Sequence, residues 1–166
     1  MDDKSAIRIV GDPGATEQLL LEVFASPDVD GEVREAALSH PGMSDDAIRL
    51  LLVGSDEGRR ARILAATDRE AILSEWARAI DPEDRSLVAF NPSTPTGCGH
   101  RLARDADPRV RASAVFNPRL PEGVVAEMAV HDHDPDVREA AATALDTGFG
   151  WSLRQGRRWF FETDGE

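Results

Sequence analysis

Residues 107–111 read Asp107-Pro108-Arg109-Val110-Arg111, and this stretch decides the fold because its spacing returns along the chain. An Asp is followed four positions later by an Arg in five places. The pairs are Asp30/Arg34, Asp56/Arg60, Asp81/Arg85, Asp107/Arg111 and Asp134/Arg138. Successive arginines are 26, 25, 26 and 27 residues apart. A period of this length indicates an internal structural repeat.

A sixth, degenerate copy precedes the other five. Stepping back 26 residues from Arg34 leads to Arg8, and Lys4 stands where the other copies have the Asp. Terminal repeats commonly depart from the consensus because one of their faces has no neighbour to pack against.

Each copy is predicted to be a pair of helices. The Asp precedes a Pro in three copies, as expected for an N-cap residue followed by Pro at the first helical position. A Pro seven residues past the Arg, preceded in two copies by Asn91 or Asn117, predicts the end of this helix with the Asn in the left-handed conformation. Apolar residues 13 and 17 positions past the Arg then lie on one face of a second helix. Neighbouring pairs must stack to bury these faces.

The pattern Asp-Pro-x-Val-Arg, a run of small residues, Asn-Pro and a second apolar segment resembles the leucine-rich repeat variant family and, more distantly, HEAT repeats. The resemblance covers roughly residues 28–146 and is clearest from Asp107 to Met128 and at Asp134 to Arg138. It implies a right-handed superhelix of alternating helical layers. Members of the family that hold an iron–sulfur cluster carry a cysteine cluster that this chain lacks, so that cofactor is not carried over and we expect none.

We therefore expect an all-α protein, a right-handed α-solenoid of about six short helix pairs. Residues 1–147 would form the repeat domain, with residues 1–27 as its degenerate first repeat. Residues 148–166 contain five of the nine aromatic side chains, and we expect them to form an aromatic cap over the last helix pair, or else a docking segment.

Composition narrows the classes of partner. There are 31 acidic and 19 basic residues, for a net charge of −12, and a field of this sign repels nucleic-acid phosphates and anionic lipid. No apolar run is long enough to span a membrane and the first residues do not form a signal peptide, so a cytoplasmic location is expected. A single cysteine, Cys98, excludes an internal disulfide.

The recurring Asp/Arg pair is interpreted as structural. The Asp would cap its own helix, and the Arg would pair with that Asp or with the aspartate of the adjacent copy, which forms a ladder along the stack. A catalytic group has no reason to recur five times. The alternative is a row of arginines that binds an extended acidic ligand.

Two other groups of residues resemble a reactive or metal-binding site, but a structural interpretation is favoured for each. Cys98 and His100 are two apart, so on a helix they point in different directions, and Cys98 stands where other copies have an apolar core residue. His131-Asp132-His133-Asp134 resembles a set of metal ligands but lies in an interhelix connector, so we expect a solvated loop with no more than weak metal binding.

The leading hypothesis for function is a non-catalytic scaffold that binds a protein or peptide. Its surface would be a shallow concave one formed by the second helices, whose charges are mixed in sign. The candidate partner-binding residues are Arg49, Arg78, Arg101, Arg104, Trp151, Trp159 and Phe160. The alternatives are a nucleic-acid-binding or base-excision protein of the HEAT type, and a small-molecule enzyme on the same scaffold.

Overall fold

The computed structural model describes residues 1–147, and the expected capping tail, residues 148–166, lies outside them. The described part is all-α and contains eleven helices. Their bounds are α1 Asp3–Val10, α2 Glu17–Ala25, α3 Gly31–Ser39, α4 Asp45–Val53, α5 Glu57–Ala66, α6 Glu70–Trp76, α7 Pro82–Phe90, α8 Thr96–Leu102, α9 Pro108–Val115, α10 Glu122–His131 and α11 Pro135–Thr147. None of these helices has the length and apolar character needed to cross a bilayer.

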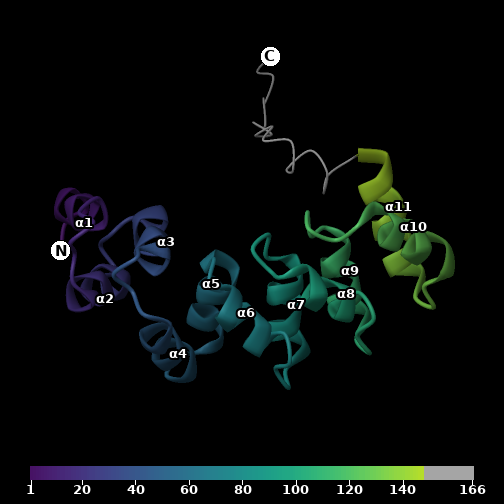
Figure 1. Ribbon diagram of the computed structural model, residues 1–166, viewed down its shortest axis with the longest axis horizontal. Helices are drawn as coiled ribbons and strands as arrows, with labels where there is room; N and C mark the ends of the chain where they lie inside the picture. Colours follow the sequence, from purple (N-terminus) through teal and green to yellow (C-terminus); the bar gives the residue numbers. More distant parts are fainter. Residues whose placement is uncertain (148–166) are drawn as a thin grey trace, which may run out of the picture.

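The helices pack in sequential pairs, in an arrangement that is repeat-like. Figure 1 shows them following one another along the long axis, from α1 at one end to α10 and α11 at the other. Each odd-numbered helix contacts the next odd-numbered helix, and each even-numbered helix contacts the odd-numbered helix that follows it. The predicted presence of two helices, a first and a second, in each full copy is confirmed.

The first helices begin where the repeated aspartates stand. Asp30, Asp56, Asp81, Asp107 and Asp134 each accept a hydrogen bond from a backbone amide two or three residues later. A side-chain acceptor at this position satisfies one of the unpaired amides at a helix N-terminus. In the degenerate first copy, Asp2 takes this role by accepting from the amide of Ser5.

One detail of the predicted helix ends was wrong. Asn91, which ends α7, has φ −63° and ψ 125°, so it lies in the extended region and not in the left-handed one. The following Pro92 explains this, because a residue before proline is pushed toward extended backbone.

Buried polar side chains join the ends of successive first helices. The amide nitrogen of Asn117 donates to the carbonyl oxygens of Ala89 and Asn91, at 2.8 and 2.9 Å. Asn91 donates in the same way to Leu64 and Thr67 of the preceding copy, at 2.8 and 2.9 Å. Both asparagines are buried. Carbonyls left unpaired at one helix end are therefore satisfied by the next copy.

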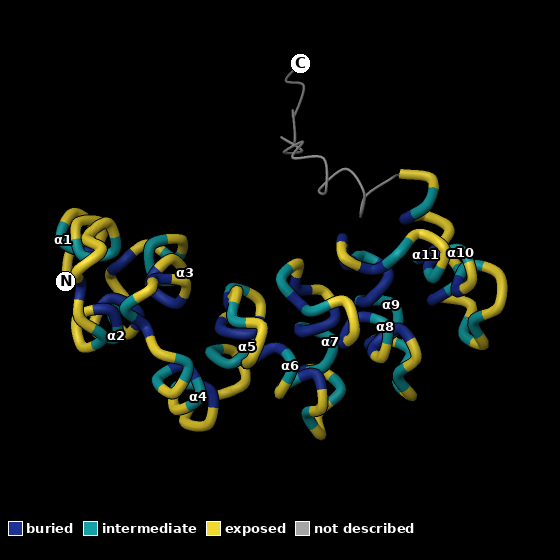
Figure 2. Tube along the Cα trace, in the orientation of Figure 1, coloured by how far each residue is buried: buried dark blue, intermediate teal, exposed yellow. Residues whose placement is uncertain are grey.

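The core runs through the whole stack. Figure 2 shows buried segments where neighbouring helices face one another. Small residues such as Ala37, Ala89 and Ala114 on the first helices are buried and let these helices approach closely, while Leu52, Leu73 and Leu102 on the second helices fill the space beside them.

Candidate functional site

Ion pairs with two hydrogen bonds each join neighbouring copies. Arg85 binds Asp105 with two hydrogen bonds, from Nε and from a terminal nitrogen, both at 2.8 Å. Arg111 binds Asp132 in the same two-point geometry, again at 2.8 Å for each bond. This fork-to-carboxylate arrangement is the most directional ion pair that proteins form.

Each of these arginines also binds its own copy. Arg85 donates to the carbonyl oxygens of Ala79 and Ile80, both at 2.9 Å. Arg111 donates to the carbonyl of Asp105 at 2.9 Å. One guanidinium therefore holds the connector before its own helix and the connector of the next copy.

The five repeated aspartates that precede the first helices, here called the signature aspartates, are not the partners of Arg85 and Arg111. Asp105 and Asp132 each stand two residues before a signature aspartate, in the connector, while Asp107 and Asp134 serve as N-caps. Asp107 also pairs with the exposed Arg109 at 2.9 Å. This pair, with the backbone amide of Arg109, lowers the pKa of Asp107 to about 2.

Burial and ion pairing have opposite effects on the pKa of the two connector aspartates, Asp105 and Asp132. The side chains of Arg111 and Asp132 are only 13% and 7% exposed. The hydrogen bonds from Arg85 and Arg111 lower the pKa of Asp105 and of Asp132 below their ordinary value, and this outweighs the burial, which raises it. Both carboxylates are therefore charged at neutral pH.

The other signature arginines depart from this geometry. Arg60 makes a single bond of 2.7 Å to the buried Asp84, because Ala79 occupies the position equivalent to Asp105. Arg138 donates to the carbonyl of Asp132 at 2.7 Å. The Nε atom of Arg34 is buried and has no hydrogen-bond partner among residues 1–147.

A cleft with exposed apolar walls lies between α4 and α6. It has a volume of about 490 Å³ and its apolar lining includes Leu52, Val53, Trp76 and Ile80. Val53 is 81% exposed and Ile80 is 99% exposed. Large apolar side chains with this much exposure, grouped in one concave place, are typical of binding sites.

Charged residues of both signs surround this cleft. Three arginines and three acidic residues line it, namely Arg49, Arg60, Arg78, Glu75, Asp81 and Asp84. Arg49 bonds to Glu75 at 3.0 Å and to Asp46 at 2.9 Å, which ties α4 to α6 across the cleft. Together these residues define what we call the α4–α6 cleft.

A second cleft occupies the equivalent position between α8 and α10. Its volume is about 310 Å³, and it is lined by residues 103–105 directly after α8, by residues of α10 and by Arg111 of α9, as the first is lined by α4, α6 and Arg60 of α5. Arg104, Glu127, His131 and His133 contribute its polar surface. The space between consecutive second helices is therefore opened more than once along the molecule.

The candidate partner-binding residues fall into three groups. Arg49 and Arg78 line the α4–α6 cleft, and Arg104 lines the α8–α10 cleft. Arg101 lies on α8, where it donates to the carbonyl of Ala77 at 3.4 Å. The three aromatic candidates lie outside the described residues; they are Trp151, Trp159 and Phe160.

The surroundings of Cys98 and of residues 131–134 agree with the structural interpretation of each. Cys98 is buried, and its thiol donates to Ser74 Oγ at 3.7 Å, so the predicted apolar placement is confirmed. His131 and His133 are exposed, whereas Asp132 between them belongs to the ion pair with Arg111. No group of three or more potential metal ligands occurs in residues 1–147.

Sequence reasoning missed the true partners of the ladder. The signal was present in the two clearest copies, as Asp105-Ala106-Asp107 and Asp132-His133-Asp134, where an additional Asp precedes the cap by two residues. Asp105 was not considered as a partner of an arginine, and Asp132 was considered only together with the neighbouring histidines.

No family model, curated protein or solved structure matches the chain. The resemblance to leucine-rich repeat variant proteins stays a prediction from the residues quoted above.

Proposed function

We propose that the chain is a non-catalytic scaffold, built as a right-handed α-solenoid, that binds a protein or peptide through the clefts between its second helices. The observation that carries this proposal is the α4–α6 cleft. There Val53 and Ile80 are exposed beside the half-buried Trp76, within a rim of charges of both signs.

The chemistry of this cleft fits an apolar side chain of a partner, flanked by charged residues. Covering Val53 and Ile80 removes apolar surface from water, and a tryptophan beside them is a residue type enriched at interface hot spots. A rim of mixed sign, such as Arg78 with Glu75 and Asp81, favours a partner with alternating charges over a uniform polyanion.

A catalytic role fits the same cleft less well. Two of the arginines that line it form ion pairs: Arg49 is held by Glu75 and Arg60 by Asp84. The raised pKa of each arginine comes first from its hydrogen bond to that carboxylate, which keeps it fully charged. Groups held in this way fix geometry and do not exchange protons near neutral pH. We accordingly propose a cofactor-free binding protein and, on the sequence grounds given above, a cytoplasmic one.

The test is differential affinity capture from the native host. Bait proteins would be the wild type, the double variant Val53→Ser/Ile80→Ser, and the control Val130→Ser. Val130 is 67% exposed on α10 and does not line either cleft, so the control removes the same kind of exposed side chain elsewhere.

The proposal predicts a protein that is retained by the wild type and by Val130→Ser and lost with the double variant. The direct binding of the recovered protein would then be measured by titration calorimetry. Capture profiles that are the same for all three baits would contradict the assignment of this cleft.

A further inference from the structure

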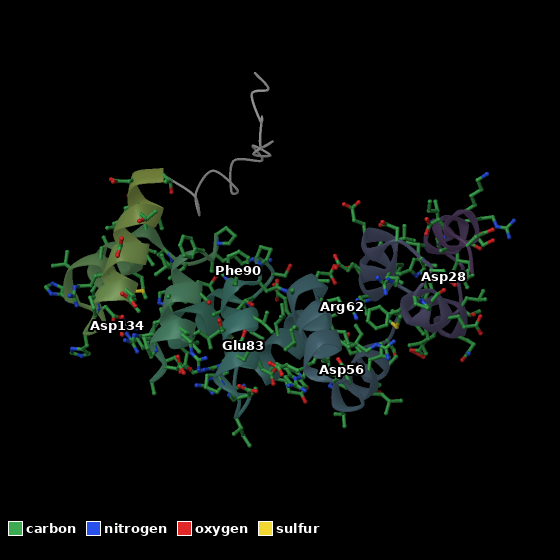
Figure 3. The ribbon with its side chains drawn as sticks, turned by 180° about the vertical axis from the view of Figure 1, so that it is seen from behind. Asp28, Asp56, Arg62, Glu83, Phe90 and Asp134 are labelled. Carbon is green, nitrogen blue, oxygen red and sulfur yellow. The ribbon has the colours of Figure 1, made fainter. Side chains whose placement is uncertain are left out.

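A small cleft between α3 and α5 gathers three arginines. It is lined by Arg34, Arg59 and Arg62 together with Phe24, Gly31 and Glu35. Figure 3 labels Arg62 on α5, on the side of that helix toward α3. Arg62 follows Arg60 by two positions, so the two side chains point about 200° apart around the helix. This cleft is therefore separate from the α4–α6 cleft.

Arg34 is a ladder arginine that has no carboxylate partner within residues 1–147. The aspartates that bind Arg85 and Arg111 precede the next N-cap by two residues, and Gly54 stands at that position before Asp56. The Nε atom of Arg34 is buried and has no hydrogen-bond partner in the described part of the chain, whereas the same atom of Arg85 and Arg111 binds a carboxylate at 2.8 Å. A buried charged donor without an acceptor is unfavourable, so this group favours any acceptor that can reach it.

Arg59 and Arg62 add positive charge at the same place. Within residues 1–147 neither forms an ion pair, and the Arg59 guanidinium lies 5.6 Å from the centre of the Phe24 ring. Stacking on an aromatic ring orients a guanidinium and leaves its N–H edge available. Glu35 is the one acidic residue that lines the cleft, against three arginines. This local excess stands out in a chain whose net charge is −12.

We propose that this cleft is an anchor for an acidic segment of a partner protein. One Asp or Glu side chain would take the place on Arg34 that Asp105 and Asp132 take on the later ladder arginines, while Arg59 and Arg62 bind the neighbouring acidic residues. The cleft has a volume of about 30 Å³, far less than that of the α4–α6 cleft. A site of this size suits the end of a carboxylate side chain.

The experiment observes the arginine side chains directly by nuclear magnetic resonance. An acetylated, amidated hexaglutamate peptide would be titrated into the full chain at low salt, and the Nε–H signals of Arg34, Arg59 and Arg62 followed. Hexaglutamine is the uncharged control peptide. Arg62→Gln tests the site through an exposed side chain, and Arg8→Gln, exposed on α1, removes the same charge elsewhere.

A saturable shift of the Arg34 Nε–H signal with hexaglutamate and not with hexaglutamine is expected. Arg62→Gln should weaken the affinity by about tenfold, as for the loss of one charge-assisted hydrogen bond, and Arg8→Gln by less than about twofold. Absence of that shift at millimolar peptide would overturn the proposal. A short DNA duplex that shifts the same signals at lower concentration would also overturn it, in favour of a phosphate site. Neither result depends on Val53 or Ile80, so the test leaves the α4–α6 cleft to be judged separately.

Discussion

Replacing Arg111 with alanine is expected to lower the free energy of unfolding by about 3 kcal/mol. The substitution removes the two bonds to Asp132 and the bond to the carbonyl of Asp105. It also leaves the Asp132 carboxylate, which is 7% exposed, without its counter-charge. An unpaired buried charge is destabilising by several kcal/mol. The expected loss of stability is therefore larger than the contribution of a surface ion pair.

Arg60 and Arg34 serve as controls, because they occupy the same repeat position as Arg111 and have fewer partners. Arg60→Ala removes one bond to Asp84, so a loss of about 2 kcal/mol is expected. Arg34 has no ion pair within residues 1–147, so Arg34→Ala should cost no more than about 1 kcal/mol, mainly through its packed aliphatic stem. The expected order of destabilisation is Arg111, then Arg60, then Arg34.

The assay is urea and thermal unfolding followed by circular dichroism, with all variants in one buffer. For a chain of this size, 3 kcal/mol corresponds to a fall of about 6–12 °C in Tm. The pairing itself is isolated by a double-mutant cycle with Asp132→Asn. The reasoning is refuted if Arg111→Ala is no more destabilising than Arg34→Ala, or if the cycle gives no coupling between Arg111 and Asp132.

Three further outcomes follow from the same contacts. The pKa of Asp132 is lowered in the folded state, so its ionisation contributes stability that is present above the unfolded-state pKa of about 3.9. This contribution is lost as the pH falls through the pKa of the folded state. In urea unfolding, the difference in stability between the wild type and Asp132→Asn should therefore be largest near neutral pH and vanish in strong acid. Asn117→Ala should cost about 2 kcal/mol in urea unfolding, since it strands carbonyls of the preceding copy. Gly42→Ala should lower Tm because its Cβ would lie 2.5 Å from the carbonyl oxygen of Ala15, whereas Gly97→Ala, with open space around it on α8, should raise Tm slightly; equal effects of the two would contradict the packing described here.

The repeat and the helix starts could be predicted from the sequence because both are local. An aspartate that accepts from an amide two or three residues later needs nothing from outside its own copy, so the five signature aspartates mark five helix starts wherever the copies lie in space. The pairing of a first with a second helix follows from the apolar spacing within each copy in the same way.

The contacts between copies could not be predicted in the same detail. Arg85 and Asp105 are 20 residues apart, and whether a guanidinium reaches a connector aspartate depends on how far one copy is displaced from the next. For Arg60 the partner is Asp84, which lies on α7, the first helix of the next copy, and not in the connector. Sequence alone indicated that the arginines need carboxylates, but not which carboxylates.

Two of the three clefts described above lie in copies in which the ladder is incomplete. Where the connector has an Asp, as at Asp105, the arginine is held at both edges and the connector is fixed to the next copy. Where Ala79 stands instead, Arg60 has a single ion-pair bond and the adjacent Ile80 is almost fully exposed in the α4–α6 cleft. Where Gly54 stands, Arg34 has an Nε atom that is unpaired within residues 1–147, in the cleft with Arg59 and Arg62. A regular ladder uses its polar groups to hold the stack together, so a copy that breaks the pattern leaves polar groups available for a partner.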